Sequence, residues 1–153
     1  MQEARPDRAA VQRALEEAVL EVLETMCFEF PADEPSAGEP AVDGTVQAVA
    51  RFAGSARGAL RVALAGEAPR RLAAAFLGMD ETDVGAQKVL QMASELANML
   101  CGATLSRLAP HGRLRIATPE AGWGGEPSGG GGWLRFPLEG GEVAVTLKWE
   151  EES

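Results

Sequence analysis

The sequence predicts an α/β fold of the α+β type, in which helices pack on one face of a mostly antiparallel five-stranded sheet. Apolar residues recur at helical spacing in an early and a late segment, and five short segments alternate apolar with polar residues as strands do. The expected order of elements is α-β-β-α-α-β-β-β. At 153 residues, the chain is expected to form a single domain, residues 1–153.

The first element is an amphipathic helix that Asp7 can cap and that runs to about Met26. Its apolar residues lie three and four positions apart, and its charged residues fall largely off that stripe, so one face packs on the core. Residues 31–44 follow, and they contain three prolines among acidic and small residues. This composition is typical of a surface loop, which we expect to be flexible.

Two alternating segments, residues 46–52 and 60–64, then predict a hairpin, because glycines bracket the connection between them. A short helix is expected over residues 70–77, ended by Gly78. Three further strands are expected over residues 114–116, 134–138 and 143–149. Between the first and second of these three, the glycine-rich residues 120–132 lack the Lys-Ser/Thr of a phosphate-binding P-loop and are expected to form a flexible loop.

A long helix is expected from residue 83 to Leu108, with Asp80 or Thr82 as its cap and Pro110 as its stop. One broad side is apolar and should face the sheet, and the opposite side is polar. The apolar side comprises Val89, Met92, Ala93, Leu96, Leu100 and Ala103, and the polar side comprises Gln87, Lys88, Gln91, Ser94, Glu95 and Asn98, continued by Gly102.

Glu95 and Asn98 are the candidate functional pair. They lie three residues apart, so their side chains emerge on one face of neighbouring turns. A rigid helix suits a pair that must enter a partner's active site and hold a water molecule there. Gly102 has no side chain and leaves open space beside Asn98. By itself this spacing is weak support, because exposed Glu and Asn are usually only solvated.

Composition excludes several other classes of function. A net charge of −9 disfavours nucleic acid and anionic membranes as partners. The N-terminus lacks the apolar core of a signal peptide, and no stretch approaches the ~20 apolar residues of a membrane span, so we expect a cytoplasmic protein. Cys27 and Cys101 are expected to be reduced and buried. The single histidine, His111, builds no catalytic triad, and no Cys/His cluster predicts a metal site.

Residues 94–103, Ser-Glu-Leu-Ala-Asn-Met-Leu-Cys-Gly-Ala, resemble the signature helix of the CheC/CheX/FliY chemotaxis phosphatase family. Residues 19–26 resemble the opening helix of CheX. Phe-Ala-Gly at 52–54, followed by Gly-Ala-Leu at 58–60, resembles its first hairpin. The likeness spans roughly residues 11–149, and the motif occurs once, as in CheX.

The resemblance implies a phosphatase that hydrolyses the aspartyl phosphate of a CheY-like response regulator. Asn98 would align the attacking water, and Glu95 would pair with the lysine of the receiver domain. Gln91, Ser94 and Gly102 would contact the partner. The receiver would hold the Mg²⁺, so the resemblance implies no cofactor or metal on this chain itself. It also implies a homodimer.

Two departures from the family pattern keep an alternative open. Gln91 stands where the family has Asp or Ser, and Pro119 follows Asn98 after twenty residues rather than twenty-two. Gln91 favours the alternative of a non-catalytic CheX-like dimerisation or receiver-binding module in a two-component or motility pathway. A third interpretation, a purely structural domain in which the pair occurs by chance, is disfavoured by the length of the likeness.

Overall fold

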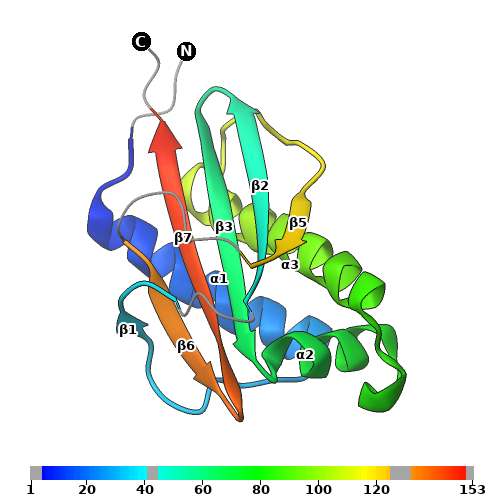
Figure 1. The fold of residues 1–153 in the computed structure, drawn as a ribbon. Coiled ribbons are helices and arrows are strands. Elements are labelled where there is room, and N and C mark those ends of the chain that lie inside the picture. The colour runs from blue at the N-terminus through cyan, green and yellow to red at the C-terminus, as the bar shows by residue number, and fades with distance from the viewer. Residues whose placement is uncertain (1–4, 41–44, 125–131, 151–153) are drawn as a thin grey trace.

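The computed structural model describes residues 5–40, 45–124 and 132–150. Helices cover one face of an antiparallel sheet (Figure 1), which confirms the predicted fold class. None of the described helices combines the length and the apolar character needed to cross a bilayer. The helices are α1 (Arg8–Cys27), α2 (Ala68–Leu77) and α3 (Ala86–Leu108), with a short 3₁₀ turn η1 (Glu81–Asp83) before α3.

All pairs in the sheet are antiparallel, and the strand order is β1-β6-β7-β3-β2-β4, with β5 also paired to β2. One edge of β2 is therefore shared: β5 pairs with its first half and β4 with its last residues. The strands are β1 (Ser36–Ala37), β2 (Val46–Gly54), β3 (Arg57–Gly66), β4 (Leu114–Ile116), β5 (Glu120–Trp123), β6 (Leu134–Leu138) and β7 (Gly141–Glu150).

The described sheet thus has seven strands rather than the five predicted. The two extra strands, β1 and β5, fall in the segments that we expected to be loops, residues 31–44 and 120–132. β1 is two residues long, and β5 carries a glycine and little alternation, so both depend on a neighbouring strand that their own sequence does not reveal. Of the two expected loops, residues 41–44 and 125–131 lie outside the described residues.

The start of α3 also differs from the prediction. Asp80 precedes the 3₁₀ turn, in which the Asp83 N–H donates to the Asp80 carbonyl over 2.9 Å. The cap position of α3 is the extended Gly85, which offers no side-chain hydrogen bond. Asp80 and Thr82 are therefore not the caps of the long helix, because Asp80 is the residue before a separate turn and Thr82 lies within that turn. By contrast, the Asp7 carboxylate does cap α1, accepting from the Ala10 N–H over 2.7 Å.

The core lies between the sheet and the helices and follows the predicted alternation. Every second residue of the central strands points to the helices, and burying each large aliphatic side chain contributes about 1.5–3 kcal/mol. The fully buried core includes Val46 and Ala50 of β2, Leu60, Val62 and Leu64 of β3, Phe136 of β6, Val143 and Val145 of β7, Leu15, Val19 and Leu23 of α1, Leu72 of α2, and Met92, Ala93, Leu96 and Leu100 of α3.

Gly58 of β3 lies where backbone and aromatic rings pack closely. The rings of Phe52 and Trp149 have centroids 5.6 Å apart and are tilted by 57°. A Cβ added at Gly58 would collide with the Lys148 carbonyl oxygen and would lie 2.6 Å from Phe52 Cζ. Only glycine therefore fits at this position without a shift of backbone or ring.

We predict that Gly58→Ala lowers the free energy of unfolding by about 1–3 kcal/mol, because it overpacks this contact. Gly122→Ala in β5 is the matched control: its added Cβ meets nothing within 4 Å, so it should change stability by less than about 0.5 kcal/mol. Urea unfolding measures both. Equal midpoints for the two variants and the parent would show that β3 does not pack this closely.

Candidate functional site

α3 carries the candidate site and contacts more of the other described elements than α1 or α2 does. It lies across β2 and β3, with α1 beside it, and it also contacts α2 and β5 (Figure 1). Its buried residues cover more than the predicted apolar arc, because Ala97, Cys101, Thr104 and Leu105 are buried as well. Ala103, predicted on that arc, is only half-buried. A narrow stripe of the helix therefore remains open to solvent.

The structure places the predicted site residues on or beside this stripe. Gln91, Glu95 and Asn98 are exposed, and Ser94 and Gly102 are half-buried. Gln91, Glu95, Asn98 and Gly102 follow one another at intervals of four, three and four residues, which aligns them along one side of the helix. Within the described part of the chain, the side chains of Glu95 and Asn98 make no hydrogen bond or ion pair, so both are available to a partner.

Gly102 borders this stripe on the side of β4. A Cβ built there would meet Ile116 Cδ1 at 3.8 Å, an ordinary contact. The glycine is therefore not required by crowding within the fold. Because it has no side chain, Gly102 instead leaves open space next to Asn98, as the sequence predicted.

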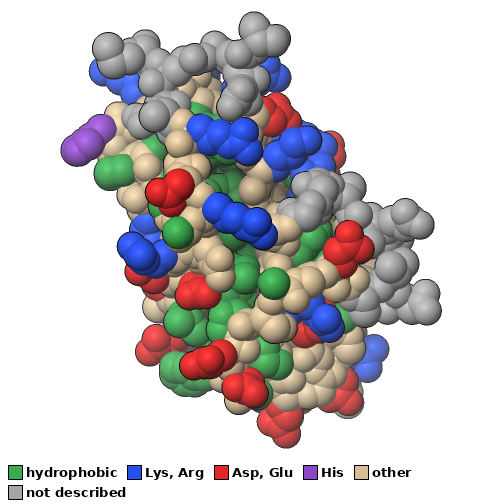
Figure 2. All heavy atoms as spheres, turned by 90° about the vertical axis from the view of Figure 1, so that its left-hand side faces the viewer, with side chains coloured by type: hydrophobic (Ala, Val, Ile, Leu, Met, Phe, Trp, Pro, Cys, Tyr) green, Lys and Arg blue, Asp and Glu red, His purple; other side chains and the backbone are tan. Residues whose placement is uncertain are grey.

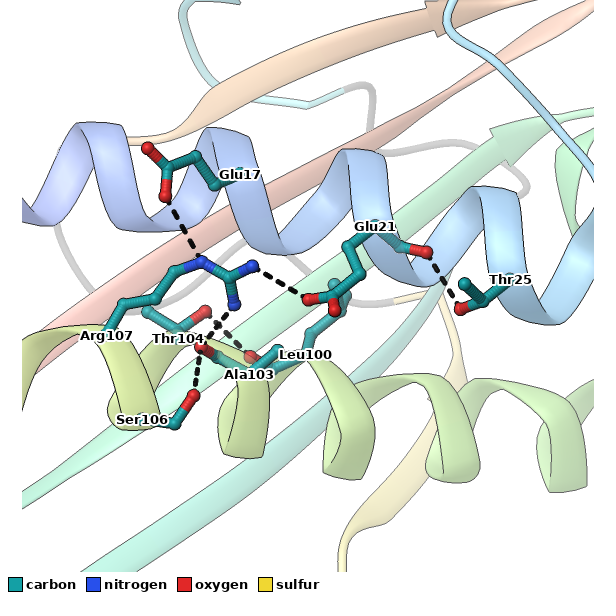
Figure 3. Close-up of polar contacts among 8 residues, drawn as sticks. All are labelled: Glu17, Glu21, Thr25, Leu100, Ala103, Thr104, Ser106 and Arg107. Carbon is teal, nitrogen blue, oxygen red and sulfur yellow. Dashed lines mark hydrogen bonds and ion pairs between the residues drawn. The ribbon is translucent and has the colours of Figure 1, made fainter. Parts of the chain in front are cut away.

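Arg107 fixes the C-terminal half of α3 to α1 (Figure 3). Its Nε donates to Glu17 over 3.2 Å, its Nη2 donates to Glu21 over 2.8 Å, and its Nη1 donates to the Ala103 carbonyl over 2.8 Å. The hydrogen bond to Glu21, followed by the other contacts with the two carboxylates, raises the pKa of the Arg107 guanidinium against the opposing effect of burial. Such half-exposed pairs contribute about 0.2–1 kcal/mol each, but they hold the helix in one orientation.

Sequence reasoning missed Arg107 as a positioning residue. An arginine in the last turn of a helix is common, and Glu17 and Glu21 are ninety and eighty-six residues away in sequence. The available signal was two glutamates four residues apart on α1, the spacing at which both reach one side of a helix. Nothing local indicated that Arg107 faces them.

The cysteines do not supply a nucleophile to this site. Burial raises the pKa of the Cys101 thiol to about 12, and burial, followed by the charge of Glu29, raises the pKa of the Cys27 thiol to about 11. Both are free and buried, so both remain protonated at neutral pH. Among the residues that the structure describes, no three His, Cys, Asp or Glu side chains gather closely enough to hold a metal ion.

The arrangement favours chemistry in a partner's cleft over chemistry in a pocket of this protein. A carboxylate and a primary amide project from the outer side of a rigid helix, where they cannot surround a small substrate. They can reach into a concave site and there accept, donate and position a water molecule.

The family model for the chemotaxis phosphatase CheX matches residues 46–126 of the chain, which include all of α3 and more than half of the sequence. No curated protein sequence matches the chain. The match agrees with the resemblance carried by residues 94–103.

Solved structures share the fold at low sequence identity. Chemotaxis protein CheX from Vibrio vulnificus superposes with a TM-score of 0.74 at 19% identity, covering 95% of this chain and 100% of that one. A putative chemotaxis protein from Desulfovibrio vulgaris Hildenborough gives 0.73 at 24%, covering 92% and 96%. The CheX-CheY-BeF3-Mg+2 complex from Borrelia burgdorferi gives 0.70 at 20%, covering 96% and 100%. The family model matches more than half of the chain and the fold agrees with it, so the chain belongs to the CheX chemotaxis phosphatase family.

Proposed function

We propose that this protein hydrolyses the aspartyl phosphate of a CheY-like response regulator, with Asn98 aligning the attacking water and Glu95 pairing with a lysine of the receiver domain. The observation that carries the proposal is the exposed Glu95–Asn98 pair on neighbouring turns of α3. Family membership supports a phosphatase, and the structurally similar CheX from Borrelia burgdorferi forms a complex with CheY.

Hydrolysis of the aspartyl phosphate needs little from the catalyst beyond the positioning of groups around the phosphorus. An acyl phosphate is already activated, so the barrier falls mainly through positioning of water and stabilisation of charge. The water oxygen bonds to phosphorus while the bond between phosphorus and the aspartate oxygen breaks, releasing inorganic phosphate and the free carboxylate. Asn98 can accept a hydrogen bond from the water with its amide oxygen and can donate to a phosphoryl oxygen with its NH₂.

Glu95 has a different task in this proposal. Its exposed carboxylate is solvated in the free protein and would pair with the receiver's lysine on docking, which sets the register of α3 in the partner's cleft. Gln91 and Ser94 would contact the rim of that cleft, and Gly102 would let the partner approach beside Asn98. We assign the Mg²⁺ to the receiver, because Glu95 is the one carboxylate among these five residues.

The second candidate function is a receiver-binding module without catalysis. Gln91 is the specific observation that favours it, since it is exposed one turn before Glu95, where the family has Asp or Ser. Such a module would make the same contact with the receiver without accelerating phosphate release.

We expect Asn98→Ala to lower the maximal rate of receiver dephosphorylation roughly a hundredfold while largely preserving binding, because it removes one preorganised polar group. Glu95→Ala should weaken binding as well as turnover. Phosphate release from a panel of phosphorylated receivers, followed over a range of receiver concentrations, measures both effects, and Arg13→Ala, exposed on α1 rather than on α3, is the control.

Circular dichroism should show all three variants folded, because exposed substitutions cost within about 0.5 kcal/mol. A double variant as active as the parent would exclude Glu95 and Asn98 as the site. A parent that binds a receiver but accelerates none would establish the non-catalytic module instead.

Gly102 offers a separate test of docking. Gly102→Ala should keep or raise the melting temperature, because glycine within a helix costs up to about 1 kcal/mol relative to alanine and the new Cβ has room. Gly102→Leu should fold but bind the receiver more weakly, because it fills the space beside Asn98. Full activity of a folded Gly102→Leu protein would show that the partner does not approach there.

We also propose a homodimer that pairs through an edge of the sheet, as the family resemblance implies, and that leaves the exposed stripe of α3 accessible. Light scattering at micromolar concentration should give about twice the chain mass of 16.1 kDa. A monomer mass at that concentration would contradict this.

A further inference from the structure

A basic hollow lies on the sheet face opposite the helices, toward the ends of β2 and β7 at the top of Figure 1. Its volume is about 630 Å³, and small residues such as Ala53 and Ala59 lie between its charged walls. The cations that line it, here called the basic hollow residues, are Arg51, Arg57, Arg61, Arg115 and Lys148.

The register of four strands brings these cations together. Ala59 of β3 lies between its partners Arg51 on β2 and Lys148 on β7. Arg115 on β4 pairs with Ala53 of β2. Arg57 and Arg61 lie two positions either side of Ala59 and therefore point to the same face of β3. The cluster is thus a product of the tertiary fold rather than of a basic stretch of sequence.

Positive charge predominates among the described residues that line this hollow. Five of the chain's fourteen basic residues gather here although the net charge of the protein is −9. Among the described residues that line the hollow, Glu150 is the one carboxylate, and Glu120 approaches Arg51 at 3.6 Å from a position that is 80% exposed. Burial, and next the charge of Arg51, lower the pKa of Arg61, while Glu150 raises it. Like charges at neighbouring positions of a sheet are destabilising unless a counter-charge is present.

Seen from the side, the surface of the molecule also carries its charges unevenly (Figure 2). In Figure 2, basic side chains are more frequent toward the upper end of the molecule, and acidic side chains gather toward the lower end. The two ends therefore attract ligands of opposite charge.

The size of the hollow indicates the size of its ligand. Four adjacent strands span roughly 14 Å across, and the distance from Arg57 to Arg61 along β3 is also roughly 14 Å. This charged area is about a quarter of the ~800 Å² that one partner of a stable protein complex buries. An area of this size suits a small-molecule ligand better than a protein partner. Four of the five cations are arginines, whose planar forks bind phosphate oxygens in pairs.

We propose that the basic hollow binds a small organic anion carrying two or more phosphate groups, of the nucleoside diphosphate class. The site lies on the far side of the sheet from α3 and does not depend on the proposed phosphatase function. The phosphates would contact Arg61 and Arg115, and the rest of the ligand would lie over Ala53 and Ala59.

Calorimetric titration of the full chain with ADP and with inorganic pyrophosphate, at about 10 mM salt to limit screening, tests this. We expect Arg61→Gln and Arg115→Gln each to weaken binding roughly tenfold, since each removes a charge-assisted hydrogen bond. Arg13→Gln, exposed on α1 on the other side of the molecule, should bind as the parent does. If Arg61→Gln fails to fold, the more exposed Arg115→Gln carries the test alone.

Three results would overturn the proposal: the parent binds neither probe at millimolar concentration, Arg13→Gln loses as much affinity as Arg115→Gln, or a hexaglutamate peptide binds while both phosphate probes fail. The last result would identify the hollow as a contact surface for acidic polypeptide. Binding of both probes, lost only in the hollow variants, supports a phosphate site.

Discussion

The structure depends on the packing of α3 against the sheet. Apolar residues of this helix meet the central strands β2 and β3 over a broad side, and α1 covers an adjacent side. This leaves Gln91, Glu95 and Asn98 exposed along one stripe. Since a helix buried this widely cannot rotate without losing several core contacts, the orientation of the stripe is set by the core. The hydrogen bonds from Arg107 to Glu17 and Glu21 also oppose sliding of α3 along α1.

Local pattern predicted the features that depend on local periodicity. The stripe of α3 could be predicted because apolar residues at three- and four-residue spacing define the opposite, polar side of a helix. The capping role of Asp7 could be predicted because a helix cap is a contact between residues only three positions apart. β1 and β5 were missed because each needs a partner strand brought from elsewhere. The cap of α3 was wrong because a 3₁₀ turn intervenes at Glu81–Asp83.

The basic hollow could not be predicted because, like β1 and β5, it depends on the pairing of segments that are distant in sequence. Arg51, Arg61 and Arg115 are scattered over sixty-five positions, and only the pairing of β4 with β2 and of β2 with β3 brings them together. The two faces of one sheet thus carry opposite characters: a helix with an exposed carboxylate and amide behind it, and a cationic hollow in front. Only the hollow is a consequence of strand register, which a single sequence reveals poorly.

The position of Asn98 in the complex is the most direct test of the central claim, because it is the only asparagine in the chain. Protein labelled with ¹⁵N at asparagine alone yields a single side-chain NH₂ pair in an NMR spectrum. A receiver whose aspartate carries beryllium trifluoride, a stable substitute for the phosphoryl group, should shift or broaden that pair strongly on binding, and the unmodified receiver should do so much less. An unchanged Asn98 NH₂ signal, while the receiver's own amide signals show that the complex has formed, would contradict insertion of Asn98 into the receiver's active site.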